Sequence, residues 1–294
     1  MFSGTATALM TPFNKDYSID YDSLRNLVEY QIEGGIDALI ALGTTAESPV
    51  LSFDERKKII ETVVSATRKR VPVLVGTGTN DTMDVVLFNK QAEELGADGL
   101  LIVNPYYNKS TQKGLVRHFT YIAQRTKLPI MLYNVPSRTG MNMLPETVIE
   151  IHTKNKNVIA MKEASGDISQ IAKLTAQAPS TLTVFSGNDD QTIPIMALGA
   201  KGIVSVFSNV FPSEMVTFTN LLLKGDFQSA QKLIPYYLPM MNALFAETSP
   251  APLKYISSVV GLCKNVVRMP LIEVGKTTET KLKEAYKLIG EATL

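Results

Sequence analysis

The chain has 294 residues, of which 45% are hydrophobic and 19% charged, a composition typical of a globular protein with one large domain or two average ones. The 29 Lys and Arg residues nearly balance the 28 Asp and Glu residues, and a formal charge of +1 gives no general basic surface for nucleic acid or an anionic membrane. No apolar run approaches the roughly 18 residues that cross a bilayer. The first residues, MFSGTATALMTPF, do not resemble a signal peptide, so we expect a cytoplasmic protein.

Cysteine and histidine are scarce. Cys263 is the only cysteine, which excludes an intrachain disulfide and a multi-cysteine zinc site. The two histidines, His118 and His152, fall in stretches that we predict to be helical and surface-facing. The scarcity of these residues therefore predicts no metal site built from histidine or cysteine.

Short apolar runs recur along the chain, and each is followed by an amphipathic stretch. The runs are continuous rather than alternating, which is typical of strands covered on both faces. The eight runs are residues 5–10, 38–42, 71–75, 99–103, 129–133, 158–161, 182–185 and 202–207.

The segments between the runs carry signals for helix ends. Ser52 and Glu55 have the spacing of a capping box, and Asp20 precedes apolar residues spaced for one helical face. Gly34 and Gly35 follow that helix and are expected to end it. Leu95-Gly96 and Leu198-Gly199 are expected to end two further helices, and Pro145 suits a first helical turn.

Eight strand-then-helix units predict a (β/α)8 TIM barrel, which typically needs about 250 residues. A doubly wound open sheet is the alternative, but it usually has fewer strands. Its phosphate-binding fingerprint is also missing, because Gly76-Thr77-Gly78 lacks a third glycine at the right offset.

The segment after Pro212 is predicted to be helical, with helices near 214–223, 227–245, 251–262 and 278–289. One of these closes the barrel. We therefore expect a barrel over 1–224 and a C-terminal helical subdomain over 225–294.

In a barrel of this kind the active site lies at the C-terminal ends of the strands and in the loops that follow. This rule selects hydroxyls, amides and one lysine, without the carboxylates and histidines that metal-assisted hydrolysis requires. The selected positions are 43–45, 77–80, 104–107, 133–134, 162, 186–189 and 208–209.

Lys162 interrupts the apolar run VIAMKEA. A strand-end lysine often extends its ammonium into water, but at a barrel mouth it can be both partly desolvated and accessible. Burial disfavours the ammonium, and the neutral amine is a nucleophile that forms a Schiff base with carbonyls. Met161 and Glu163 should point to the opposite side of the strand, so Glu163 is a poor candidate for an ion pair with Lys162.

Schiff-base chemistry needs proton transfers, and Tyr133 ends the neighbouring strand. Thr44 both donates and accepts hydrogen bonds, so it could link Tyr133 to another hydroxyl. Arg138 lies in the loop after the fifth strand, where its planar guanidinium could hold a substrate carboxylate. Asp189 and Asp190 suit a helix N-cap better than a cation site.

Four motifs resemble those of the 4-hydroxy-tetrahydrodipicolinate synthase family, also called dihydrodipicolinate synthase, within the pyruvate-dependent class I aldolases. The resemblance covers essentially the whole chain. The motifs are GTTAES at 43–48, NPYYNK at 104–109, YNVPSRTG at 133–140 and MKEASG at 161–166. The first motif and the Tyr–Lys pair are shared across the superfamily, whereas PYYNK and the arginine of SRTG point more narrowly to the synthase.

The resemblance implies that a lysine amine forms an imine with pyruvate and that the derived enamine adds to aspartate-β-semialdehyde. It implies no metal and no organic cofactor, and a homotetramer built from two tight dimers. By the same resemblance, Lys162 is the nucleophile, and a proton relay is formed by Tyr133, Thr44 and a Tyr107 that comes from a neighbouring subunit. The resemblance also implies that Thr44 and Thr45 hold the pyruvate carboxylate and that Arg138 holds the semialdehyde carboxylate. Gly187 and Val204 would line the pyruvate pocket.

The chain departs from the family pattern at two places. Ala46 stands where the family commonly has glycine. Members that lysine inhibits usually carry histidines at the positions of Phe53 and Arg56 and a glutamate at that of Asp84, although Ser48, Asn80 and Tyr106 match the regulatory pocket. We therefore expect weak or absent inhibition by lysine.

Two other functions remain open at this point. A related N-acetylneuraminate lyase or 2-keto-3-deoxy acid aldolase would keep Lys162 and Tyr133 and act on a sugar-derived acid, but such relatives generally lack an arginine at the position of Arg138. A noncatalytic barrel that senses a keto acid or serves as a scaffold would be expected to have lost Lys162, Tyr133 or Thr44, and all three are present.

Overall fold

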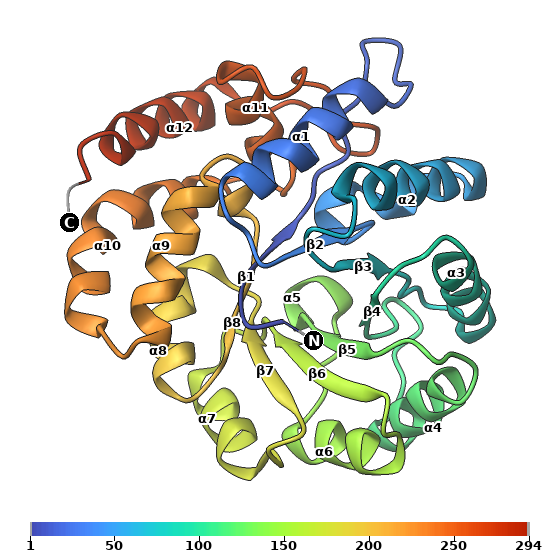
Figure 1. Ribbon diagram of the computed structural model, residues 1–294. Coiled ribbons are helices and arrows are strands. Elements are labelled where there is room, and N and C mark those ends of the chain that lie inside the picture. The colour runs from blue at the N-terminus through green and yellow to red at the C-terminus, as the bar shows by residue number, and fades with distance from the viewer. Residues whose placement is uncertain (1, 293–294) are drawn as a thin grey trace.

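The computed structural model describes residues 2–292 and contains a closed barrel of parallel strands surrounded by helices (Figure 1). Each strand pairs with its neighbours in chain order, and β1 pairs with β8 to close the ring. The strands are β1 (Gly4–Ala8), β2 (Ala38–Ala41), β3 (Val73–Gly76), β4 (Gly99–Val103), β5 (Ile130–Asn134), β6 (Val158–Glu163), β7 (Thr183–Ser186) and β8 (Gly202–Ser205). All eight apolar runs form strands, and the predicted (β/α)8 barrel is confirmed.

The helices surround the ring, and α9 completes the last strand-then-helix unit. The barrel helices are α1 (Tyr21–Glu33), α2 (Phe53–Thr67), α3 (Thr82–Glu94), α4 (Gln112–Ala123), the short α5 (Pro136–Thr139), α6 (Pro145–Lys154), α7 (Ile168–Gln177), α8 (Thr192–Ala197) and α9 (Pro212–Leu223). The capping box of Ser52 and Glu55 is present on α2, and Asp20 caps α1.

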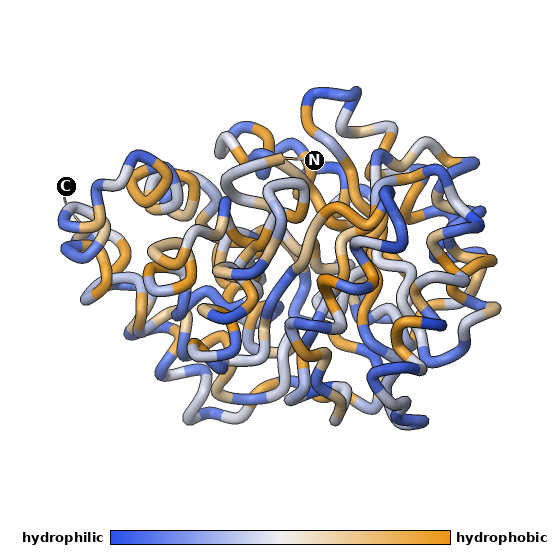
Figure 2. Tube along the Cα trace, turned by 90° about the horizontal axis from the view of Figure 1, so that it is seen from below, coloured by the Kyte–Doolittle hydropathy of each residue, from blue (hydrophilic) through white to orange (hydrophobic). Residues whose placement is uncertain are grey.

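Two apolar layers hold the barrel together. The inner layer fills the ring with side chains such as Ala6, Ile40, Met131 and Phe185, and the outer layer lies between the strands and the helices. Figure 2 shows hydrophobic segments inside the molecule and hydrophilic segments along its rim. Because both faces of the sheet are buried, the strands have continuous rather than alternating apolar sequences.

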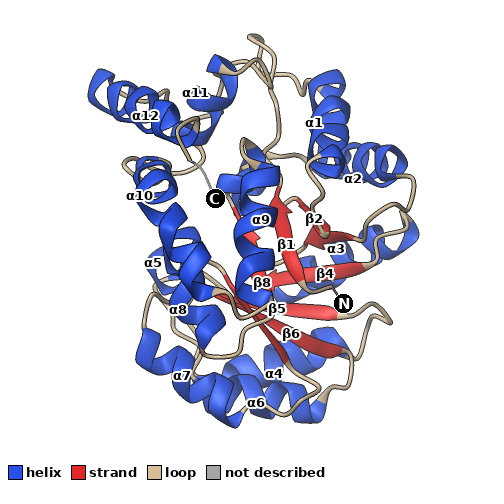
Figure 3. Ribbon diagram, turned by 60° about the vertical axis from the view of Figure 1, so that its left-hand side comes forward, coloured by secondary structure: helices blue, strands red, loops and turns tan. Residues whose placement is uncertain are grey.

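The C-terminal extension contains α10 (Phe227–Ala243), α11 (Ala251–Val259) and α12 (Lys276–Ile289). These helices lie together on one side of the ring (Figure 3). The outer apolar layer continues into the extension through Tyr237, Met240, Leu253 and Leu282. The boundary after residue 224 stays a prediction.

Candidate active site

Lys162 lies near the C-terminal end of β6, at the barrel mouth. Parallel pairing places it level with Tyr133 on β5 and Phe185 on β7. Its side chain is buried, and its Nζ lies 4.2 Å from the centre of the Tyr133 ring. The register between two neighbouring strands thus brings the predicted nucleophile and the predicted proton-transfer residue together.

Glu163 points away from this pair. Its carboxylate accepts hydrogen bonds from the Ser165 backbone N–H at 2.7 Å and from the side-chain amide of Asn134 at 3.2 Å. Burial raises the pKa of Glu163. It forms no ion pair with Lys162, as the alternation of side chains along the strand predicts.

Gly187 follows β7 and leaves room for the Lys162 side chain. A β-carbon at this position would lie 3.0 Å from Lys162 Cε and 2.6 Å from Ala164 Cβ. Such distances require neighbouring atoms to move. A glycine here therefore lets the lysine chain pass close to the backbone.

A cavity of about 490 Å³ opens above Lys162. Six of the predicted site residues line it: Thr44, Thr45, Tyr133, Arg138, Lys162 and Gly187. Val204 instead lies fully buried in the inner apolar layer that includes Tyr133, and Val206, two residues later, lines the cavity.

The loop that carries Thr44 and Thr45 is fixed to the rest of the barrel by backbone and side-chain contacts. Residues Thr44–Ala46 form a 3₁₀ turn, and the Thr11 hydroxyl donates to the Ala46 carbonyl at 2.9 Å. The methyl group of Ala46 is buried within the fold. Glu47, which follows, has a left-handed backbone with φ of 56°. Its buried carboxylate lies 2.5 Å from Nζ of Lys254 on α11.

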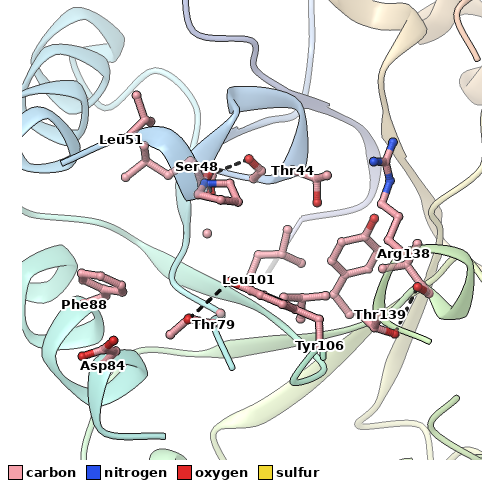
Figure 4. Close-up of a pocket in the computed structure, with 18 of the residues that line it drawn as sticks. Thr44, Ser48, Leu51, Thr79, Asp84, Phe88, Leu101, Tyr106, Arg138 and Thr139 are labelled. Atoms are coloured by element: carbon pink, nitrogen blue, oxygen red, sulfur yellow. Dashed lines mark hydrogen bonds between the residues drawn. The ribbon is translucent and has the colours of Figure 1, made fainter. Parts of the chain in front are cut away.

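Arg138 is exposed on α5, at the cavity mouth (Figure 4). It lines both this cavity and a neighbouring one of about 380 Å³, together with Thr44 and Tyr133. A guanidinium in this position can bind a carboxylate that enters from solvent.

Only some of the positions that match the family's regulatory pocket line a common cavity in the structure. Ser48, Tyr106, Arg56 and Asp84 line the 380 Å³ cavity. Asn80 does not line this cavity, although the preceding Thr79 does, and its carbonyl accepts a hydrogen bond from the Asn108 side chain at 2.9 Å. The remaining departure from the family pattern, Phe53, is exposed on α2.

Tyr107 does not reach the site of its own chain. Its side chain is 90% exposed and lines neither cavity, and its backbone φ is 67°. The neighbouring Tyr106 does line the 380 Å³ cavity.

One group of residues at the site was missed from the sequence, and one residue, Asp189, was predicted to have a different role. Residues 245–249, between α10 and α11, line the cavity above Lys162. Asp189 is buried and accepts hydrogen bonds from the Ser205 hydroxyl at 2.5 Å and from the Val206 and Phe207 backbone N–H groups at 3.1 Å each. It therefore fixes the loop after β8 and does not cap a helix, which corrects the prediction.

The histidines also differ from the prediction, because both are buried rather than surface-facing. His118 bonds to the Thr82 hydroxyl at 2.9 Å, and burial lowers its pKa to about 4. His152 lies between the Val158 carbonyl and the Thr181 hydroxyl. Each is thus part of the helix packing.

Within residues 2–292, no group of three or more His, Cys, Asp or Glu side chains is placed to hold a metal ion. No helix in the same range is both long and apolar enough to cross a membrane.

The model of the dihydrodipicolinate synthetase family matches residues 1–289. The chain belongs to this family. It is 45% identical to the 4-hydroxy-tetrahydrodipicolinate synthase of Thermotoga petrophila over 99% of both chains, and 43% identical to that of Geobacter metallireducens over 98% of both. The crystal structure of the dihydrodipicolinate synthase of Thermotoga maritima superposes with a TM-score of 0.96 at 43% identity over 99% of both chains.

Another solved relative is the chloride-inhibited dihydrodipicolinate synthase from Acinetobacter baumannii in complex with pyruvate, with a TM-score of 0.96 and 36% identity over 99% of both chains. These relatives confirm the predicted family and a lyase-type enzyme of the 4-hydroxy-tetrahydrodipicolinate synthase kind. They support the synthase rather than the sugar-acid lyase.

Proposed function

We propose that Lys162 of this chain forms a Schiff base with pyruvate and condenses it with L-aspartate-4-semialdehyde to give 4-hydroxy-tetrahydrodipicolinate, in lysine and diaminopimelate biosynthesis. The observation that carries the proposal is a buried lysine that lines a cavity of about 490 Å³ beside a tyrosine. Lys162 has no ion pair with any residue from 2 to 292, so an acidic side chain does not hold its amine in place.

The first half of the reaction makes a carbon nucleophile. The Lys162 amine attacks the ketone carbon of pyruvate, and loss of water leaves an imine. Loss of a methyl proton then gives an enamine. Tyr133, whose ring lies against the amine, is placed to move protons in these steps.

The second half forms the ring. The enamine carbon attacks the aldehyde, which makes the new carbon–carbon bond and regenerates the imine. The amino group of the semialdehyde then attacks the imine carbon, so the ring closes and Lys162 leaves as a free amine. Thr44 and Thr45 hold the pyruvate carboxylate, and Arg138 holds the semialdehyde carboxylate from the cavity mouth.

Steady-state measurement of ring formation tests this assignment. Lys162→Ala should lose turnover by about four orders of magnitude or more, because the covalent route is closed. Lys173→Ala is the matched control, since Lys173 is an exposed lysine on α7 that pairs with Glu146. Substantial turnover of Lys162→Ala, or equal losses in both variants, would contradict the proposal.

The active enzyme is proposed to be a homotetramer of two tight dimers, in which Tyr107 completes the proton relay of a neighbouring subunit. The support is that Tyr107 is exposed and lines neither cavity of its own chain. Mixing inactive Lys162→Ala subunits with impaired Tyr107→Phe subunits should restore activity, because each mixed pair contains one intact site. No gain on mixing, after confirmed subunit exchange, would show that Tyr107 does not act across an interface.

A further inference from the structure

Asn134 follows Tyr133 on β5, and its side chain is fully buried. Because successive side chains alternate along a strand, Tyr133 points into the ring and Asn134 points to its outer side. Glu163 has the same relation to Lys162 on β6, and parallel pairing places Asn134 level with Glu163. A polar pair therefore lies behind the pair that carries the proposed chemistry.

The side-chain amide of Asn134 is fully hydrogen-bonded. Its nitrogen donates to the Glu163 carboxylate at 3.2 Å and to the Asn142 side-chain oxygen at 2.8 Å. Its oxygen accepts from the Asn104 side chain at 2.9 Å and from the Met143 backbone N–H at 2.9 Å. An amide has two donor hydrogens and an oxygen with two acceptor sites, so these contacts use its whole capacity.

Three strand ends meet at this amide. Asn104 directly follows β4, Asn134 ends β5, and Glu163 ends β6. The Asn104 backbone N–H also donates to the Tyr133 carbonyl at 3.1 Å. These contacts tie β5 to its neighbours at the level where Nζ of Lys162 lies 4.2 Å from the centre of the Tyr133 ring.

The same amide closes the loop that carries Arg138. The chain leaves β5, forms the short α5 and returns at residues 142–143, where both residues bond to the Asn134 side chain. Arg138 lies within this loop and lines the cavity above the reactive lysine. The Asn142 side chain in turn donates to Gln170 on α7 at 2.7 Å. One buried side chain thus connects the strand ends to the loop of the guanidinium.

We propose that Asn134 is a positioning residue for the reaction, which keeps Tyr133 against Lys162 and holds the loop of Arg138 above them. Reacting groups must be held to within about 0.5 Å of their productive geometry, and a buried amide with all of its hydrogen bonds made is a rigid support. Asn134 does not line the cavity itself, so it acts through its neighbours. This role rests on the proposed function, because it is a role in that reaction.

Borohydride trapping of the pyruvate imine by the full-length enzyme tests the strand contact. Asn134→Asp puts a second carboxylate against that of Glu163 and removes the donor between them, so imine trapping should slow by about tenfold or more. The exchanged pair Asn134→Asp/Glu163→Gln offers the same hydrogen bond with donor and acceptor reversed. It should therefore recover most of the lost rate.

Steady-state kinetics test the loop contact. Asn142→Ala removes one partner of the amide and leaves the strand ends tied, so the KM for the semialdehyde should rise by about threefold or more. The KM for pyruvate and the trapping rate should change by less than about twofold, because Thr44 and Thr45 belong to another loop. Asn142 is only partly buried, so this variant keeps the proposal testable if Asn134→Asp folds poorly.

Asn155→Ala is the matched control, since Asn155 is a buried asparagine that precedes β6 at the end far from Lys162 and donates to the Ile151 carbonyl at 2.8 Å. Its loss should lower the urea midpoint and leave imine trapping unchanged. Wild-type trapping in a folded Asn134→Asp, no recovery in the exchanged pair, an unchanged semialdehyde KM in Asn142→Ala, or equally slow trapping in Asn155→Ala would overturn the role. Absence of a pyruvate adduct in the wild type would instead contradict the proposed function, and this role with it.

Discussion

Replacement of Lys254 by methionine tests how the C-terminal extension holds the loop that carries Thr44 and Thr45. Lys254 is fully buried on α11, and its Nζ lies 2.5 Å from Glu47, 2.9 Å from the Val266 carbonyl and 3.7 Å from the centre of the Phe13 ring. Methionine keeps the length of the side chain and removes its charge. The Glu47 carboxylate is then left buried with the Arg268 backbone N–H, at 2.9 Å, as a hydrogen-bond donor.

Removal of one partner of a buried ion pair costs about 3–5 kcal/mol, so we expect the free energy of unfolding to fall by roughly 4 kcal/mol. Urea unfolding followed by circular dichroism, at one fixed protein concentration, measures this change. The KM for pyruvate should also rise, because Glu47 comes two residues after Thr45 in the loop proposed to hold the pyruvate carboxylate.

Two further variants serve as controls. Lys276→Met removes an exposed lysine that pairs with Glu279 and should leave the unfolding midpoint unchanged. The double variant Glu47→Leu/Lys254→Met should recover most of the lost stability, because no buried charge is left alone. A fall in the free energy of unfolding of less than about 1 kcal/mol in Lys254→Met would refute the reasoning, because removal of an exposed ion pair costs no more than that.

Other predictions concern the site and its pH dependence. Gly187→Ala should slow imine formation with pyruvate by about tenfold or more, because its methyl group would lie 3.0 Å from Lys162 Cε, and wild-type trapping rates would contradict this. Arg138→Ala should lose turnover of the semialdehyde while it still forms the pyruvate imine, and surviving condensation would weaken the synthase assignment. Free lysine should inhibit turnover weakly or not at all. Measurable inhibition of turnover by lysine near millimolar concentration would contradict this prediction. Burial lowers the pKa of His118 from 6.5 to about 4 in the folded state, so the unfolded state takes up the proton first. The free energy of unfolding should therefore fall by about 3 kcal/mol as the pH drops through this range. His118→Gln should remove that part of the pH dependence, and an unchanged slope in urea unfolding would count against it.

The barrel could be predicted from the sequence because its strands are covered on both faces. That burial produces continuous apolar runs such as GLLIV at 99–103 and requires a helix between successive strands. Lys162 was detectable because it interrupts one of these runs. Its pairing with Tyr133 follows from the parallel register of β5 and β6.

Other features depend on tertiary contacts that leave no local signal. Asp189 has the sequence context of a helix cap, but the return of the chain at β8 brings three donors to its carboxylate. Residues 245–249 line the site because α10 and α11 carry their connection to the barrel mouth. The histidines are spaced like ordinary helical polar residues, and neighbouring elements bury them.

Reduction with borohydride in the presence of pyruvate, followed by peptide mass mapping, tests the central claim most directly. The account predicts a single pyruvate-derived adduct on Lys162, none on the exposed Lys173, and none in the Lys162→Ala variant. An unmodified Lys162 in an otherwise active enzyme, or an adduct on a different lysine, would contradict it.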